Sequence, residues 1–210
     1  MGLLRDPRQT SGLLDVRVLQ HNERACSVAC LAMLVNAARA LQSGPLRKPL
    51  TQLELLRRVG SPQWKAAVSP GGDGVTLDEL ARLATQSLKT CGVTRFVIDV
   101  VHVERVTPSA RRRARQTLTE IVSSASRFLI VNFLHGIYTG DPHGNIGHYA
   151  LVAGYDPDQN SVLVLDPDLR DYQPYWVSEE TFLDGMATHD EAAGRARGYL
   201  SIGLDFGPIP

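Results

Sequence analysis

The sequence has few cysteines, no excess of charge of either sign and no long apolar run. Three cysteines in 210 residues are too few for a disulfide framework. Acidic and basic residues number 22 each, so no overall field attracts nucleic acid, and we expect no nucleic-acid partner. No stretch of about 18 consecutive apolar residues occurs, so we expect no membrane partner. A hydrophobic share of 43% can still build a core, which predicts a single domain over residues 1–210.

The two ends of the chain differ in pattern. Residues 1–12 are polar and without periodicity, and we expect a flexible arm there. They lack the apolar run of a secretory signal peptide, which, together with free cysteines, favours a reducing cytoplasm as the location. Residues 13–92 are predicted to be mainly helical, and residues 93–210 mainly sheet.

One segment of the helical half, residues 25–42, is apolar on almost every side. A helix of that kind belongs inside a core. Capping boxes predict two further helix starts, at residues 51–54 and 76–79. Residues 13–19 alternate in their second half and predict a short strand, whereas the glycine- and proline-bearing residues 60–74 predict a long surface loop.

The second half contains runs rich in β-branched and other apolar residues. They predict strands over residues 95–102, 128–133, 148–155, 161–165 and 199–204. A basic helix over residues 109–126 and a short helix beginning at Ser178 lie between them. Helices first and mostly antiparallel strands later predict an α+β fold.

Cys26 lies in the predicted first turn of the buried helix. Unpaired N–H groups and the helix dipole favour an anion there, a setting in which a thiol becomes a thiolate. Gln20, six residues upstream, can point a side-chain N–H at the same place. We interpret Cys26 as a nucleophile, with Gln20 and the Cys26 backbone N–H as its oxyanion hole.

Thiol catalysis also needs an imidazole and a group that orients it. His148 follows a glycine at the start of an apolar strand, which would hold its ring rigidly at the edge of the core. Asp166 ends the next strand, so a hairpin would place it beside His148, although Asp168 remains an alternative. His135 and His143, in the loop before that glycine, could line a cleft, but we expect them to be exposed.

A metal site is a second interpretation of the cysteines. Cys30 lies four residues after Cys26, on the same helix face, but neither His21 nor Glu23 completes a familiar zinc spacing. We therefore predict no metal site and no cofactor, and expect Cys30 and Cys91 to pack in the structure. A non-enzymatic scaffold that binds a metal or a partner through Cys26 and Cys30 remains an alternative.

Four blocks of sequence carry a family resemblance: residues 20–36, 74–80, 147–155 and 165–177. Together they resemble the papain-like cysteine peptidases and, more narrowly, the catalytic domain of phytochelatin synthase in a short bacterial-type form. The resemblance covers about residues 20–186. It implies a papain-like fold, with the nucleophile on a buried central helix packed on a mostly antiparallel sheet.

The resemblance also implies an activity. Cys26, His148 and Asp166 would be the triad and Gln20 the oxyanion donor of an enzyme acting on glutathione-like γ-glutamylcysteinyl peptides. An acyl-Cys26 intermediate would release glycine, and hydrolysis or transpeptidation would follow. The partner is then a small thiol peptide, metal ions enter only as thiolate complexes of that substrate, and homodimer formation is left open.

Two positions depart from the family pattern. Ser27 stands where the family usually has glycine, and Leu169 stands where it usually has an arginine three residues past the catalytic aspartate. We expect Arg170, Gly147 and Tyr149 to contribute to substrate binding. The departure at Leu169 leaves an alternative function open: a papain-like cysteine peptidase, or a tailoring acyltransferase, acting on a different peptide or acyl thioester.

Overall fold

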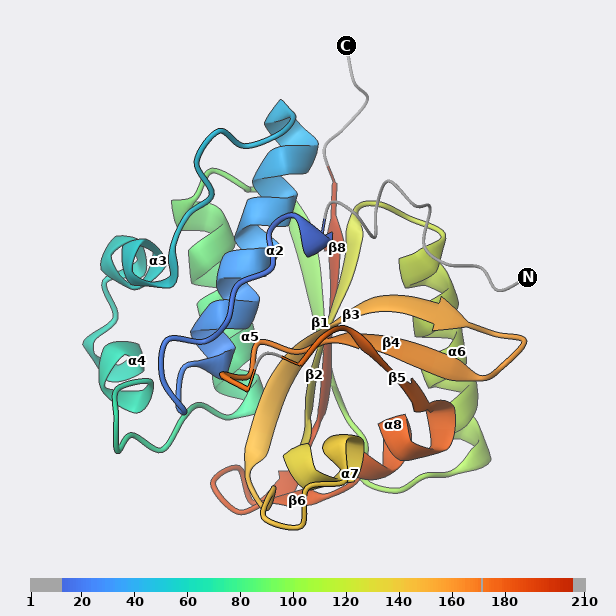
Figure 1. Ribbon diagram of the computed structural model, residues 1–210. Coiled ribbons are helices and arrows are strands. Elements are labelled where there is room, and N and C mark those ends of the chain that lie inside the picture. Colours follow the sequence, from blue (N-terminus) through green and yellow to red (C-terminus); the bar gives the residue numbers. More distant parts are fainter. Residues whose placement is uncertain (1–12, 171, 206–210) are drawn as a thin grey trace.

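The computed structural model describes residues 13–170 and 172–205. The flexible arm expected over residues 1–12 lies outside these described residues. One antiparallel sheet runs through the middle of the fold, and helices cover both of its faces (Figure 1).

The sheet has six strands in the order β1-β8-β2-β3-β4-β5, and every neighbouring pair is antiparallel. The strands are β1 (Phe96–His102), β2 (Arg127–Leu134), β3 (Gly147–Asp156), β4 (Ser161–Leu165), β5 (Tyr175–Ser178) and β8 (Gly198–Leu204). The last strand in the chain, β8, lies between β1 and β2. A sheet of this kind beside separate helices confirms the predicted α+β class.

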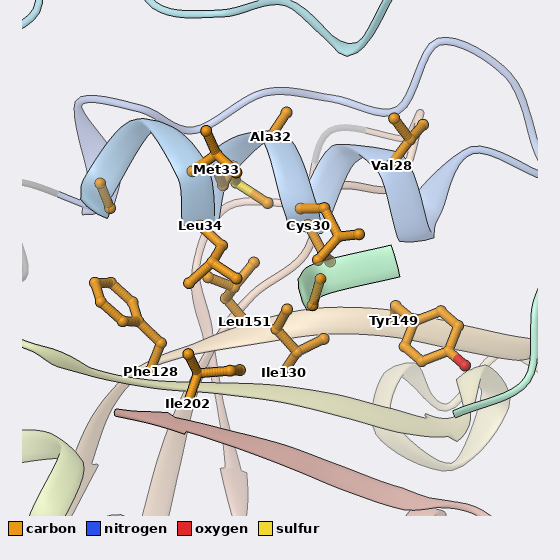
Figure 2. Close-up of a cluster of buried hydrophobic side chains, with 14 of the residues drawn as sticks. Val28, Cys30, Ala32, Met33, Leu34, Phe128, Ile130, Tyr149, Leu151 and Ile202 are labelled. Carbon is orange, nitrogen blue, oxygen red and sulfur yellow. The ribbon is translucent and has the colours of Figure 1, made fainter. Parts of the chain in front are cut away.

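The first half of the chain supplies the helices of one face. They are α2 (Cys26–Ser43), α3 (Gln52–Val59), α4 (Pro62–Ala67) and α5 (Leu77–Thr90). Capping boxes at Thr51 and Thr76 begin α3 and α5, as predicted. Side chains of α2 and of the sheet interdigitate in this layer, including Met33, Phe128 and Ile202 (Figure 2).

A second layer covers the opposite face. It contains α6 (Pro108–Val122), α7 (His135–Thr139) and α8 (Glu179–Met186), followed by a small hairpin of β6 (His189–Asp190) and β7 (Arg195–Ala196). In β2, Phe128 and Ile130 belong to the α2 layer, while Leu129 and Val131 belong to the α6–α8 layer. Burial on both faces explains why this strand is apolar at every position from Phe128 to Leu134 except Asn132.

Helix α2 is the central buried element. Every residue from Cys26 to Ala38 is buried, as the sequence predicted. By length and composition α2 could cross a membrane, with a mean hydropathy of 1.3, and 72% of it is buried inside the fold. A core helix of a globular protein can have the same length and composition, and α2 is buried as such a helix is.

Two secondary-structure predictions are wrong. Residues 13–19 form no strand: Leu13 and Val16 are buried three positions apart in a helical turn. The predicted loop over residues 60–74 contains α4, which begins with Ser61 as N-cap and a proline at its first position, and buries Trp64. Proline at that position starts a helix as readily as it marks a loop.

Candidate active site

Cys26 is the first residue of α2 and lies in the wall of a cleft. The preceding residue, Ala25, gives no side-chain cap, and the first turn holds no acidic residue, so the positive end of the helix dipole faces the thiol without competition. The next residue, Ser27, accepts a 3.3 Å hydrogen bond from the indole N–H of Trp64. This contact ties α4 to α2 directly beside the thiol.

His148 and Asp166 meet at the ends of neighbouring strands. His148 is the second residue of β3, and Asp166 directly follows β4. His148 Nε2 lies 2.7 Å from Asp166 Oδ1, and both side chains are fully buried. Cys26 is within hydrogen-bonding reach of the same imidazole, whose second nitrogen, Nδ1, is not used by Asp166. The structure thus brings Cys26, His148 and Asp166 together, with the imidazole within hydrogen-bonding reach of both the thiol and the carboxylate.

The charges of this group stabilise one another. Burial opposes a charged imidazole, but the negative charge of Asp166 and hydrogen bonds to Asp166 and Cys26 outweigh it, and raise the pKa of His148 to about 10. Burial likewise opposes ionisation of Asp166, yet the charge and hydrogen bond of His148 keep its pKa below the usual value. The stable form is therefore an imidazolium beside a carboxylate.

The Asp166 carboxylate is held at both oxygens. The backbone N–H of Asp168 donates to Oδ1 at 2.9 Å, and the hydroxyl of Tyr175 donates to Oδ2 at 2.8 Å. Asp168, the alternative orienting carboxylate, instead binds Arg170. The geometry therefore selects Asp166 as the residue that orients His148.

Gln20 is buried in the segment before α2, at 4% exposure. Its backbone N–H donates to the carbonyl of Pro167 at 2.7 Å, which fixes this segment to the turn after Asp166. Its side-chain Oε1 has no hydrogen-bond partner among the residues that the structure describes. The role of Gln20 as oxyanion donor stays a prediction.

The cleft beside Cys26 has a volume of about 770 Å³, within the usual range for small-molecule sites. Residues from both halves of the chain line it. Gly147 and Tyr149, two of the predicted substrate-binding residues, are among them. The lining also includes two buried polar residues, Asn132 and Arg197, that no sequence motif marked as functional.

The family model described as Phytochelatin synthase matches residues 9–199. The chain belongs to the phytochelatin synthase family.

Individual relatives agree with this membership. The chain is 26% identical over 202 residues to the Glutathione gamma-glutamylcysteinyltransferase of Schizosaccharomyces pombe, covering 90% of this chain and 42% of that protein. It is 34% identical over 103 residues to Glutathione gamma-glutamylcysteinyltransferase 3 of Lotus japonicus, covering 48% of this chain and 21% of that protein. The chain thus spans less than half the length of these curated relatives.

Arg170, predicted to bind substrate, is not among the residues lining the cleft of this phytochelatin synthase family member. Its guanidinium is bound by the carboxylates of Asp168 and Asp141, and Nη2 lies 3.0 Å from His135 Nδ1. The neighbouring Leu169 is 47% exposed. Leu169, like Arg170, is not among the residues that line the cleft.

Two arginines of the described chain line the cleft, the exposed Arg24 and the buried Arg197. Arg197 is the one held inside the fold. It follows the β6–β7 hairpin, is only 8% exposed, and its Nε has no hydrogen-bond partner among the described residues. Gly147 makes room for it: a Cβ at this position would lie 2.9 Å from Arg197 Nη2. No sequence pattern around Arg197 predicted its place in the cleft. The glycine before His148 was an indirect signal, because it leaves the space that the Arg197 side chain fills.

His135 was expected on an exposed loop, and that prediction is wrong. It is fully buried at the start of α7, with its ring centroid 4.8 Å from that of His148 in an edge-on arrangement. Burial and the charge of His148 lower the pKa of His135, so the ring is neutral. His143 is exposed, as predicted.

Within residues 13–170 and 172–205, one group of side chains has the spacing to hold a metal ion. Ligand atoms of His135, His148 and Asp166 lie within 4.8 Å of one another. A cation there would have to break the 2.7 Å contact between His148 and Asp166, and would sit beside the Arg170 guanidinium. The arrangement therefore favours hydrogen bonding over metal ligation.

The two-thiol alternative is also disfavoured. Cys30 is completely buried in α2. Burial, reinforced by the negative charges of Cys26 and Asp166, raises the pKa of the Cys30 thiol well above its usual value. A metal needs the thiolate form as its ligand, and this setting opposes it.

Proposed function

We propose that this chain is a cysteine-dependent acyl-transfer enzyme of papain-like architecture that acts on glutathione or a closely similar γ-glutamylcysteinyl peptide. The observation that carries the proposal is the His148 imidazole, which lies 2.7 Å from the Asp166 carboxylate and within hydrogen-bonding reach of the Cys26 thiol at the wall of a cleft. The names of the relatives, glutathione gamma-glutamylcysteinyltransferases, support the choice of substrate.

In the first half-reaction, the Cys26 thiolate attacks the carbonyl carbon of the cysteinyl–glycine amide. The resulting oxyanion accepts hydrogen bonds from the Cys26 backbone N–H and the Gln20 side chain. The imidazolium of His148 gives its proton to the amide nitrogen, the C–N bond breaks and glycine leaves. The γ-glutamylcysteinyl group remains on Cys26 as a thioester.

In the second half-reaction, neutral His148 takes a proton from water or from the amine of a second thiol peptide. The activated nucleophile attacks the thioester, and the thiolate of Cys26 is regenerated beside the imidazolium. Asp166 stays ionised throughout and stabilises the positive ring. These steps use only the chain's own groups and the substrates, so the proposal includes no cofactor, and a metal ion would enter only on substrate thiolates.

The charges in the cleft fit the γ-glutamyl end of such a peptide, which carries an α-carboxylate and an α-ammonium group. Arg197 offers a buried guanidinium with an unpaired Nε–H, and Asp190, at the other end of the β6–β7 hairpin, offers a carboxylate. An arginine is a good carboxylate ligand because its donors form a planar fork. In this proposal, Arg197 takes the place of the arginine expected at position 169.

The experiment is mass spectrometry of the intact protein, quenched with acid shortly after mixing with glutathione. We expect a mass increase of one γ-glutamylcysteinyl group on Cys26, with release of glycine. Cys26→Ala should show neither the adduct nor turnover. Cys91→Ser, which removes a thiol outside the cleft, should behave as the parent protein does.

The same assay separates the alternative substrates. Turnover of other peptides or of acyl thioesters, without any adduct from glutathione, would favour the peptidase or tailoring acyltransferase function. Parent-like turnover by Cys26→Ala would exclude thiol catalysis altogether.

A further inference from the structure

Two consecutive hydrogen bonds link three residues that line the cleft. Asn132 Nδ2 lies 2.9 Å from Tyr149 Oη, and Tyr149 Oη lies 2.9 Å from the carbonyl oxygen of Val75. Asn132 belongs to β2, Tyr149 to β3, and Val75 to the segment before α5. These two hydrogen bonds therefore join the sheet to the helical layer. Figure 2 shows the Tyr149 ring between α2 and the sheet, with its hydroxyl at the far end from the apolar cluster.

The direction of each hydrogen bond follows from the groups themselves. A carbonyl oxygen can only accept, so the single hydroxyl proton of Tyr149 points at Val75. Towards Asn132 the Tyr149 oxygen can then only accept, and the amide atom facing it must be the NH₂ group. The Asn132 amide cannot turn around without losing this bond.

The other end of the amide is left without a partner. Asn132 Oδ1 is buried and has no hydrogen bond to any residue of the described chain, and Asn132 lines the cleft. A buried acceptor without a donor is unfavourable by more than a typical hydrogen bond contributes. A ligand group that donates a hydrogen bond there would remove that penalty, whereas a group without a donor would not.

We propose that Tyr149 sets the specificity of the cleft by locking Asn132 with Oδ1 as an acceptor for the α-ammonium group of the substrate. This inference rests on the proposed function. Asp190, in the same cleft, adds the opposite charge for that ammonium group, and Arg197 binds the adjacent carboxylate. Tyr149 is then a positioning residue, because its only proton is already committed to Val75.

The test compares glutathione with glutaryl-cysteinyl-glycine, which has the same length and carboxylate but no α-amino group. In Tyr149→Phe the ring stays and the amide becomes free to turn. We expect the ratio of kcat/KM for glutathione to that for the des-amino peptide to fall about tenfold, mainly through a higher KM for glutathione. Tyr155→Phe is the matched control on the same strand: its hydroxyl bonds Glu179, and the ratio should not change.

A double-mutant cycle completes the test. Asn132→Ala should lower the same ratio, and adding Tyr149→Phe should lower it no further. If Tyr149→Phe reduces kcat/KM equally for both peptides, or if Asn132→Ala keeps the parent ratio, the inference is overturned while the proposed function stands. If the parent protein turns over neither peptide, the proposed function fails and the inference with it.

Discussion

Two buried carboxylates in this protein have similar partners and different roles. Asp166, next to the cleft, accepts hydrogen bonds from a tyrosine hydroxyl, that of Tyr175, and from the cationic ring of His148 at 2.7 Å. Glu179, in the α6–α8 layer, is buried to almost the same degree, at 3% exposure.

Glu179 also combines a tyrosine and a cation. Tyr155 donates to it at 3.3 Å and Arg115 Nε donates at 2.7 Å. Arg115 belongs to α6 and Glu179 begins α8, so this pair holds two helices of one layer together.

The difference lies in the cation. Arg115 is always charged, its side chain is 53% exposed, and it lines no part of the cleft. His148 is fully buried, can give up its proton, and lies within hydrogen-bonding reach of the Cys26 thiol. A buried carboxylate paired with a cation therefore does not by itself mark a catalytic site; a partner that can transfer a proton to a reactive atom does.

The strongest test of this difference removes the charge from each carboxylate in turn. Asp166→Asn cannot stabilise the imidazolium, and we expect kcat/KM for glutathione to fall about 10³-fold. Glu179→Gln should leave kcat/KM within about twofold and instead lower the melting temperature by about 3 °C. Steady-state kinetics and thermal unfolding measure both variants, and equal losses of activity would contradict the comparison.

The second test uses pH. The pKa of His148 is raised from 6.5 to about 10, so the native state holds a proton that the unfolded state releases between these values. That stabilisation is fully present below pH 6.5 and is lost as the pH rises through 10. We expect the free energy of unfolding of the parent protein, relative to His148→Gln, to fall by a few kcal/mol across this window.

Chemical denaturation at several pH values measures this difference. His143→Gln, at an exposed loop position, is the control and should follow the parent protein. A constant difference between the parent and His148→Gln would mean that the ring is not held charged.

The smallest expected effect comes from the tyrosines. Burial and the charge of Asp166 raise the pKa of Tyr175, so its hydroxyl keeps its proton and donates. Tyr175→Phe should lower kcat/KM about tenfold and move its acid limb to higher pH, because Asp166 then protonates more easily. Tyr155→Phe should do neither. If the pH profile of Tyr175→Phe equals that of the parent protein, Tyr175 contributes packing and does not stabilise the ionised Asp166.

Much of the secondary structure was predictable because its signals are local. The capping boxes at Thr51 and Thr76 and the all-round apolar pattern of α2 each act within a few residues. The two wrong predictions, the strand over residues 13–19 and the loop over residues 60–74, arose because the same local pattern fits more than one structure. Pro62 starts α4 at a place where proline and glycine suggested a loop, and the buried pair Leu13 and Val16 belongs to a helical turn.

The candidate site was predictable only in part. Cys26, His148 and Asp166 stand at the start of a helix, the start of a strand and the end of a strand, positions that a pattern can locate. Tyr175 reaches the site on β5, which pairs with the preceding strand β4. Arg197 reaches it on the segment before β8, a strand that pairs with β1 and β2 from much earlier in the chain. No spacing in the sequence encodes those pairings.

The sequence by itself determined the helix that carries the thiol, the strands that carry the imidazole and the carboxylate, and the family to which the chain is similar. The tertiary structure decided that a buried arginine, Arg197, lines the cleft, why His135 is buried and neutral, and which end of the Asn132 amide is left unpaired. The reason is physical: helix starts and strand periods depend on neighbours in the chain. The burial and hydrogen bonding of a polar side chain depend on residues that only the completed sheet brings beside it.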